Sequence, residues 1–136
     1  MKKIPFVVCM VMSLILASCG GKASGPSTKI DVTMTDFQFQ PNAFTVPAGQ
    51  EITLNAKNNG GVVHSFVIMN KGQSAGTEFT DQDQPNVYWQ VEIQPGGSTD
   101  TTFMAPADAG DYEVVCHVPG HLQAGMVGKL TVVANQ

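Results

Sequence analysis

Apolar and polar residues alternate with a period of two over much of this 136-residue chain. The alternation is clear in residues 30–34 and 52–56, where every second side chain is apolar. Successive side chains of a strand point to opposite faces, so this pattern is typical of strands with one buried face. Further segments of the same kind are HSFVIM (64–69), NVYWQVEI (86–93), STDTTFMA (98–105), DYEVVC (111–116) and GKLTVVA (128–134).

Clusters of Gly, Pro, Asn and Asp separate these segments, at residues 47–49, 58–61, 94–97 and 109–111. About seven short strands at this spacing, without a convincing amphipathic helix, are typical of an antiparallel all-β fold. We therefore predict a β-sandwich or barrel, with no internal repeat and no second domain.

The polar stretch from Lys71 to Asn86 is the longest gap between predicted strands. We expect an insertion there, with a helical turn. Its acidic residues, Glu78, Asp81 and Asp83, are interpreted as a solvated face rather than a docking site.

The first nineteen residues have the composition of an export signal, since two lysines precede a short apolar run. The run ends in Leu-Ala-Ser-Cys at residues 16–19, which is similar to a bacterial lipobox. This predicts a signal peptide over 1–19, lipidation of Cys19 and attachment to a membrane on the periplasmic or extracytoplasmic side. A plain secretory signal with an incidental cysteine is the alternative. Residues 20–28, rich in Gly and Ser, would form a flexible tether, and residues 29–136 the domain.

Without the signal, 5 lysines face 11 acidic residues and there is no arginine, so the net charge is 5 − 11 = −6. That balance argues against nucleic acid or an anionic membrane surface as a partner and is compatible with a basic protein. We expect a monomer.

Cys116 is the one cysteine left in the predicted domain once the signal and Cys19 are set aside. No disulfide can form within that domain. Because a lone thiol is a liability in an oxidising compartment, metal binding is favoured over a buried, unreacted cysteine.

The stretch VVCHVPGHLQAGM places Cys116, His121 and Met126 on one loop. Thiolate, imidazole and thioether form a soft ligand set that suits copper. A second imidazole must come from His64 or His117. His117 adjoins the cysteine, so on an extended backbone its side chain points to the opposite side, whereas His64 begins another predicted strand. We therefore predict His64, Cys116 and His121 as the main copper ligands, with Met126 as a weak axial ligand.

The stretches PNAFTVPAGQEITLNAKNNGGVVHSFVI and GDYEVVCHVPGHLQAGMVGKLTV strongly resemble the small blue copper proteins, or cupredoxins, of the plastocyanin and azurin group. The Cys-x4-His-x4-Met loop is most similar to that of the auracyanins, which are membrane-tethered members in photosynthetic bacteria. The resemblance implies a Greek-key sandwich of seven to eight strands and one type 1 copper ion. It also implies a one-electron carrier, not an enzyme, that connects a cytochrome or cytochrome complex to an oxidase, reductase or reaction centre.

Two residues depart from the family pattern. Ser65 stands where the family usually has an asparagine that ties the ligand loops together. His117 makes the motif resemble that of multicopper oxidases as well, but three histidines are too few for their trinuclear cluster. A copper chaperone or storage protein is the alternative function. It is disfavoured because the remaining methionines of the domain, Met34, Met69 and Met104, are scattered.

The resemblance also implies two contacts of the copper site. Backbone amides near Ser65 are expected to donate to the sulfur of the cysteine ligand. The ring edge of the second histidine ligand reaches the surface through an apolar patch in this family. Here that edge belongs to His121, with Pro119, Gly120, Leu122 and Ala124 around it.

Overall fold

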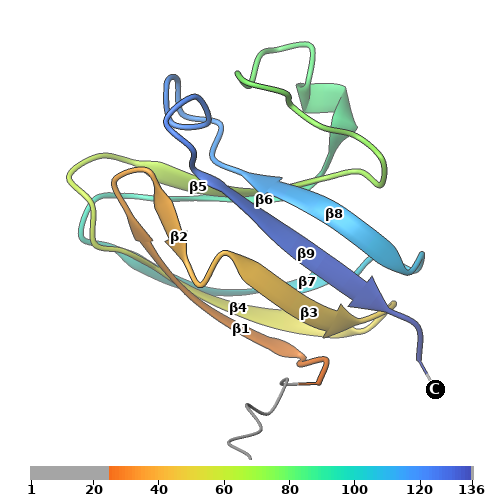
Figure 1. The fold of residues 1–136 in the computed structure, drawn as a ribbon. Helices are drawn as coiled ribbons and strands as arrows, with labels where there is room; N and C mark the ends of the chain where they lie inside the picture. Colours follow the sequence, from red (N-terminus) through yellow and green to blue (C-terminus); the bar gives the residue numbers. More distant parts are fainter. Residues whose placement is uncertain (1–24, 136) are drawn as a thin grey trace, which may run out of the picture.

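The computed structural model describes residues 25–135, which form nine strands and one short 3-10 helix (Figure 1). The predictions for residues 1–19, for Cys19 and for part of the tether lie outside the described residues. The strands are β1 (Lys29–Thr35), β2 (Gln38–Gln40), β3 (Ala43–Pro47), β4 (Glu51–Asn58), β5 (His64–Met69), β6 (Val87–Ile93), β7 (Ser98–Met104), β8 (Gly110–Val115) and β9 (Val127–Val133). No helix within 25–135 is long and apolar enough to cross a membrane.

The strands form two sheets that face each other, with the orders β2-β1-β4-β7 and β3-β9-β8-β5-β6 (Figure 1). The pairs β1/β4 and β3/β9 are parallel, and the other pairs are antiparallel. The predicted all-β sandwich is confirmed, but two of its strand pairs are parallel, where the sequence pattern indicated an antiparallel fold. The short strands β2 and β3 are additions to the segments named from the sequence.

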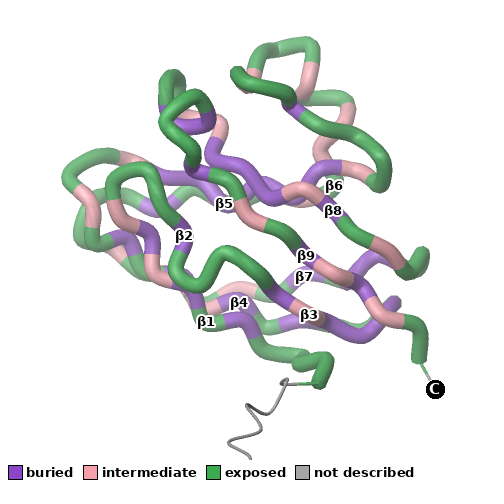
Figure 2. The backbone as a smooth tube through the Cα atoms, in the orientation of Figure 1, coloured by how far each residue is buried: buried purple, intermediate pink, exposed green. Residues whose placement is uncertain are grey.

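Apolar side chains at every second position of the strands fill the space between the two sheets. In β4 the pattern is strict, with Ile52, Leu54 and Ala56 buried and their neighbours largely turned outward (Figure 2). The same rule in β1 buries Ile30 and Val32. Apolar side chains from both inner faces therefore form one core, as the period of two predicts.

Strand β5 breaks the alternation because all six of its residues are buried. Its outer face is covered by residues 70–86, which rise above the sheet in green in Figure 1. A second apolar cluster forms there, made of Val67, Met69, Ala75, Val115 and Leu122, with Phe79 and Val87 packed against it. The predicted insertion is thus present, and its helical turn is the 3-10 helix η1 (Gln84–Asn86).

The antiparallel pairing of β5 with β8 determines where the predicted ligands meet. Val67 pairs with Val115, so the first residues of β5 lie beside the residues that follow β8. His64 opens β5, and Cys116 follows β8 directly. The loop 116–126 then covers this end of the sheet before β9 begins.

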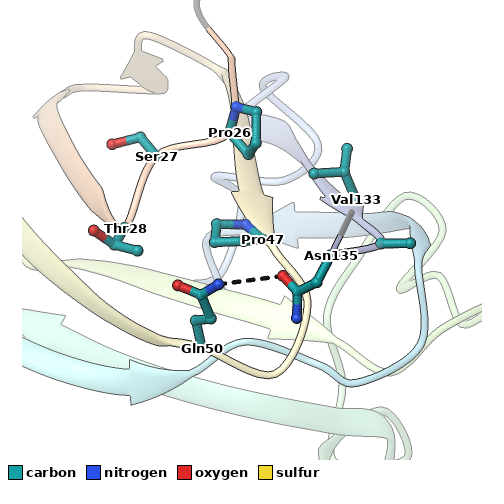
Figure 3. A pocket seen from close by; sticks show the side chains of 8 residues that line it. Pro26, Ser27, Thr28, Pro47, Gln50, Val133 and Asn135 are labelled. Atoms are coloured by element: carbon teal, nitrogen blue, oxygen red, sulfur yellow. Dashed lines mark hydrogen bonds between the residues drawn. The ribbon is translucent and has the colours of Figure 1, made fainter.

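The described chain enters the domain at the other end of the sandwich. Residues 26–28, which precede β1, line a hollow together with Pro47, Gln50 and Asn135 (Figure 3). The Gln50 amide donates to Asn135 Oδ1 at 3.2 Å across it. Strand β1 runs from this end to the end at which β5 begins (Figure 1), and because His64 is the first residue of β5, the hollow and His64 lie at opposite ends of the domain.

Candidate metal centre

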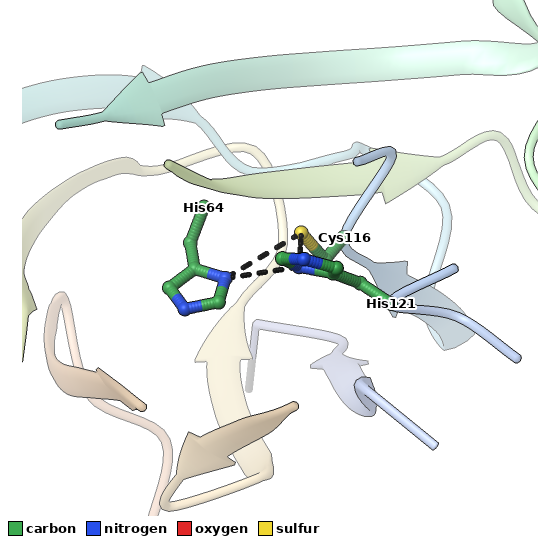
Figure 4. A group of neighbouring side chains, drawn as sticks. All are labelled: His64, Cys116 and His121. Carbon is green, nitrogen blue, oxygen red and sulfur yellow. Dashed lines mark hydrogen bonds between the residues drawn. The ribbon is translucent and has the colours of Figure 1, made fainter. Parts of the chain in front are cut away.

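Three side chains converge at the loop end of the five-stranded sheet (Figure 4). The Nδ1 atoms of His64 and His121 are 3.1 Å apart, and Cys116 Sγ lies 3.4 Å from His121 Nδ1 and 3.9 Å from His64 Nδ1. His64 and Cys116 are fully buried, and His121 is 6% exposed. Ring nitrogens and a thiol thus share one water-poor space.

These distances fit a metal ion. Ligand atoms about 2.0–2.3 Å from a common ion in a trigonal plane lie about 3.5–3.7 Å from one another. The three donor atoms all lie within 4.8 Å of one another, so small side-chain shifts would suffice to bind an ion. One thiolate and two imidazoles favour copper over a hard cation.

Met126 lies against the same space. It is fully buried and belongs to the same apolar cluster as Cys116. The Cys116 amide donates to the Met126 carbonyl at 3.3 Å, and the Met126 amide donates to the His121 carbonyl at 3.0 Å. The backbone therefore closes the loop on itself, so that residues ten positions apart become neighbours.

Tight turns shape the rest of this loop. The His121 amide donates to the Val118 carbonyl at 3.0 Å, and the Gly125 amide to the Leu122 carbonyl at 2.9 Å. Gly120 and Gly125 have φ values of +84° and +96°, which side chains rarely allow. The two glycines let the chain fold back twice between the cysteine and the methionine.

Ser65 joins the two segments that carry the ligands. Its amide donates to Cys116 Sγ at 3.4 Å, and its hydroxyl lies 3.6 Å from the same sulfur. The hydroxyl oxygen also accepts the His117 amide at 2.9 Å. The expected amide donor to the cysteine sulfur is confirmed, and the serine hydroxyl bridges the two segments where the family has an asparagine.

His117 does not belong to the cluster. Its Nε2 lies 2.7 Å from Glu92 Oε1, and its ring is 5.7 Å from that of Phe79. The three-residue group that converges is His64, Cys116 and His121. The expectation that His117 points away from the cysteine thiol is confirmed.

Burial lowers the pKa of His121 below its usual 6.5, and the neighbouring His64 ring adds to this, while the carboxylate of Asp36 acts in the opposite direction. A lowered pKa favours the neutral imidazole, because a charged ring would have to leave water. The neutral form is the one that binds a metal ion.

Two residues that sequence reasoning missed contact the histidines. Asp36 Oδ1 lies 3.2 Å from His64 Nε2. The Phe37 ring packs edge-on against His121, with centroids 5.1 Å apart, and remains 44% exposed. Both occupy the turn between β1 and β2, far from the other site residues in sequence. The positive φ of Phe37, 72°, could not be inferred from its residue type.

The structure places Leu122 elsewhere than we expect from the sequence. It was expected in the apolar patch around the edge of His121, but it is 7% exposed and packs in the second cluster, beneath residues 70–86. The turn after His121 directs consecutive side chains to different sides of the loop. Pro119, Gly120 and Ala124 are exposed as expected, and Phe37 takes the place expected for Leu122.

Fold and site together define a small blue copper protein of the cupredoxin class. The chain matches the copper binding proteins of the plastocyanin/azurin family over residues 26–133 and belongs to that family. Copper is accordingly its cofactor.

Auracyanin-A of Chloroflexus aurantiacus is 34% identical, over 92% of this chain and 93% of its own. The copper-resistant cuproprotein CopI of Rubrivivax gelatinosus is 30% identical, over 82% of this chain and 70% of its own. Among solved structures, dithionite-reduced auracyanin from Roseiflexus castenholzii superimposes with a TM-score of 0.69 at 33% identity, covering 80% of this chain and 99% of that one.

Proposed function

We propose that this protein is a membrane-tethered one-electron carrier and not an enzyme. Copper would be held by His64, Cys116 and His121, and the Met126 thioether would complete the donor set. The carrier exchanges electrons between a cytochrome or cytochrome complex and an oxidase, reductase or reaction centre. It acts on the periplasmic or extracytoplasmic side of a membrane, to which Cys19 anchors it. The family is one of electron carriers, which supports the coarser part of this proposal.

The observation that carries the proposal is the buried convergence of two imidazole nitrogens and one thiol. With Met126 also buried beside them, the protein supplies a full set of donors and encloses it. Copper bound there supplies a one-electron change between Cu(I) and Cu(II). An enclosed site of this kind suits electron transfer better than the binding of a substrate.

The surrounding residues hold the donor atoms in place. Backbone hydrogen bonds close the loop between Cys116 and Met126, and Ser65 ties this loop to β5. The core excludes water from the ligand atoms. Because the side chains are packed in one arrangement, little has to move when the charge of the site changes by one unit.

A partner would approach His121 through Phe37, because His121 is only 6% exposed whereas Phe37 is 44% exposed. The Phe37 ring packs against the His121 ring, and Pro119, Gly120 and Ala124 of the same loop as His121 are exposed. Interfaces of electron-transfer partners are small and short-lived. The surface therefore suits brief docking close to a ligand of the copper ion.

The position of the chain entry supports tethering. The described chain enters at the end of the sandwich opposite His64. A tether over residues 20–28 would hold the domain near a membrane, raise its local concentration at membrane-bound partners, and leave the copper end free to dock.

Treating cells with globomycin, which blocks lipoprotein signal cleavage, tests the anchor. We expect unprocessed precursor to accumulate, and Cys19→Ala to release the protein from the membrane fraction. Unchanged processing and unchanged membrane association would contradict the lipid anchor and leave the copper proposal standing.

Absorption spectroscopy tests the copper site. Purified protein with Cu(II) should turn intense blue through charge transfer from the Cys116 thiolate, and Cys116→Ser should remove the colour. His117→Asn is the matched control, because His117 lies outside the cluster, and it should stay blue. A colourless wild-type protein would overturn the proposal.

A copper chaperone or store is the second candidate, since two relatives are named copper-resistant cuproproteins. That function requires release of the ion to an acceptor. Binding of Cu(I) without a blue Cu(II) form, together with transfer of Cu(I) to a competing chelator within minutes, would favour it over the electron carrier.

A further inference from the structure

The turn between β1 and β2 places a carboxylate on the far side of His64 from the metal centre. Asp36 Oδ1 is 3.2 Å from His64 Nε2, while His64 Nδ1 faces Cys116 and His121. The His64 side chain is fully buried, and that of Asp36 is 48% exposed. Asp36 is the one polar partner of Nε2 among residues 25–135.

This contact assigns the tautomer of His64. An ionised carboxylate accepts hydrogen bonds and cannot donate one, so the proton of the neutral imidazole lies on Nε2. The lone pair is then on Nδ1, which is the atom that faces the other donor atoms. A carboxylate behind a ligating histidine also increases the basicity of the ligand nitrogen.

Asp36 is itself held in position. The Gly61 amide donates to both of its oxygens, at 3.1 and 3.3 Å. The Gly60 amide next to it donates to Asn58 Oδ1 at 2.8 Å, and Asn58 is fully buried. The carboxylate is thus fixed by the loop that precedes His64, although it comes from another sheet.

The absence of a side chain at Gly60 leaves room for the contact between Asp36 and His64. A Cβ added at Gly60 would collide with Asp36 Oδ1 and lie 2.6 Å from His64 Nε2. Any side chain at this position would therefore force the carboxylate and the imidazole apart. The contact thus depends on a residue that itself takes no part in the hydrogen bond.

We propose that Asp36 is a positioning residue of the copper site. Its carboxylate accepts the Nε2 proton of His64, fixes the ring as an Nδ1 ligand and favours Cu(II) over Cu(I). The inference rests on the proposed function, in which His64 binds copper. A more basic ligand stabilises the more highly charged ion, so Asp36 keeps the reduction potential lower than a neutral partner would.

Asp36→Asn tests this, because the amide keeps the size and one oxygen but loses the charge. Outer hydrogen-bond partners of a metal ligand typically contribute about 10- to 100-fold to metal affinity. We expect a Cu(II) affinity lower by a factor in this range, measured by chelator competition, with little change for Cu(I). Each tenfold fall in the ratio of Cu(II) affinity to Cu(I) affinity raises the reduction potential by about 59 mV. Voltammetry of the copper-loaded protein would detect such a shift.

Glu92→Gln is the matched control. Glu92 is also a carboxylate on a histidine, 2.7 Å from His117 Nε2, and its removal changes the net charge by the same unit. The proposal expects a much smaller shift in potential from this variant. Equal shifts in the two variants would show a general effect of charge and overturn the positioning role.

Gly60→Ala separates position from charge, since it displaces the pair and leaves all charges intact. It should raise the potential in the same direction as Asp36→Asn. NMR of the diamagnetic Cu(I) form gives a further measurement: the His64 Nε2 proton should exchange more slowly in the wild type than in either variant, and fastest in Gly60→Ala, which separates the two groups.

The outcomes distinguish the two proposals. A wild-type protein without a blue Cu(II) form contradicts the proposed function. A blue wild-type protein whose potential and Nε2 proton do not respond to Asp36→Asn contradicts the role of Asp36 alone.

Discussion

At the scale of single residues, the cysteine sulfur and the buried histidine have hydrogen-bond partners with opposite expected effects. Ser65 offers an amide at 3.4 Å and a hydroxyl at 3.6 Å to Cys116 Sγ. Donors to a thiolate stabilise negative charge on sulfur, and that charge is greater when the copper ion is reduced. Ser65 should therefore favour Cu(I), whereas Asp36 should favour Cu(II).

Ser65→Ala should lower the reduction potential, because the sulfur loses one donor. The copper-free protein should lose about 1 kcal/mol of unfolding free energy, since the His117 amide loses its acceptor. Voltammetry and urea denaturation measure the two effects. Ser98→Ala, at an exposed position of β7, is the control, and a potential that rises in Ser65→Ala would contradict the prediction.

The buried phenol of Tyr112 leads us to expect that the protein becomes less stable at alkaline pH. The Tyr112 hydroxyl donates to the Asp108 carbonyl at 2.7 Å, and the residue is 4% exposed. Burial raises the pKa of Tyr112 above 10.0, and the charges of Asp108 and Tyr88 contribute. The unfolded chain then loses this proton first, so the free energy of unfolding falls as the pH rises above the ordinary tyrosine pKa.

Tyr112→Phe should cost about 1 kcal/mol at neutral pH and should lose less stability than the wild type as the pH rises past about 10. Urea denaturation at neutral and alkaline pH measures this. Tyr88→Phe removes an exposed phenol whose contribution to the Tyr112 pKa ranks below burial and Asp108, so this variant should keep most of the alkaline loss. If the free energy of unfolding of Tyr112→Phe fell with rising pH as steeply as that of the wild type, the prediction would be wrong.

At the scale of elements, residues 70–86 support the metal loop from outside. They cover the outer face of β5 and enclose Leu122, the residue after His121, in the second cluster. Glu113 of β8 fastens this segment by accepting the Ala75 amide at 2.9 Å and the Ser74 hydroxyl at 3.1 Å. The insertion therefore acts on the site through packing, without supplying any of the three converging side chains.

Leu122→Ala should cost about 2–5 kcal/mol of unfolding free energy and should also shift or broaden the blue absorption band, because the support of His121 is lost. Leu130→Ala is the matched control. It makes the same deletion in β9, in the main core, and should destabilise the protein without changing the band. Equal spectra for the two variants would show that the second cluster does not position His121.

At the scale of the whole molecule, the metal site connects segments that are distant in the sequence. His64 comes from the start of β5, and the other three site residues from the loop between β8 and β9. An ion that binds the folded state and not the unfolded state stabilises the fold by mass action, by about 2.7 kcal/mol at a free concentration of 100 Kd.

Removing copper with a chelator should therefore lower the Tm, and adding Cu(II) back should restore it. Calorimetry of the wild type and of Cys116→Ser, with and without copper, checks this. The variant should show almost no difference between the two conditions. An equal Tm for copper-free and copper-loaded wild type would contradict the prediction.

Much of the fold could be predicted because the buried positions of most strands follow the two-residue period of the apolar residues in the sequence. Ile52, Leu54 and Ala56 alternate in the sequence and in the core. The three-residue β2 was missed because a segment so short carries little periodic signal. The six buried residues of β5 show no alternation, since the insertion covers the face that would otherwise meet water.

The sequence by itself determined the sandwich, the soft donor set and the choice of His64 over His117, because these follow from local spacing and from ligand chemistry. Only the tertiary structure decided which residues surround the donors. Asp36 and Phe37 reach the histidines because the β1–β2 turn of one sheet meets the loop end of the other. Leu122 turns away from the surface because the loop reverses after His121. Contacts between segments distant in sequence depend on how the sheets pack and how loops turn, and neither leaves a periodic signal in the chain.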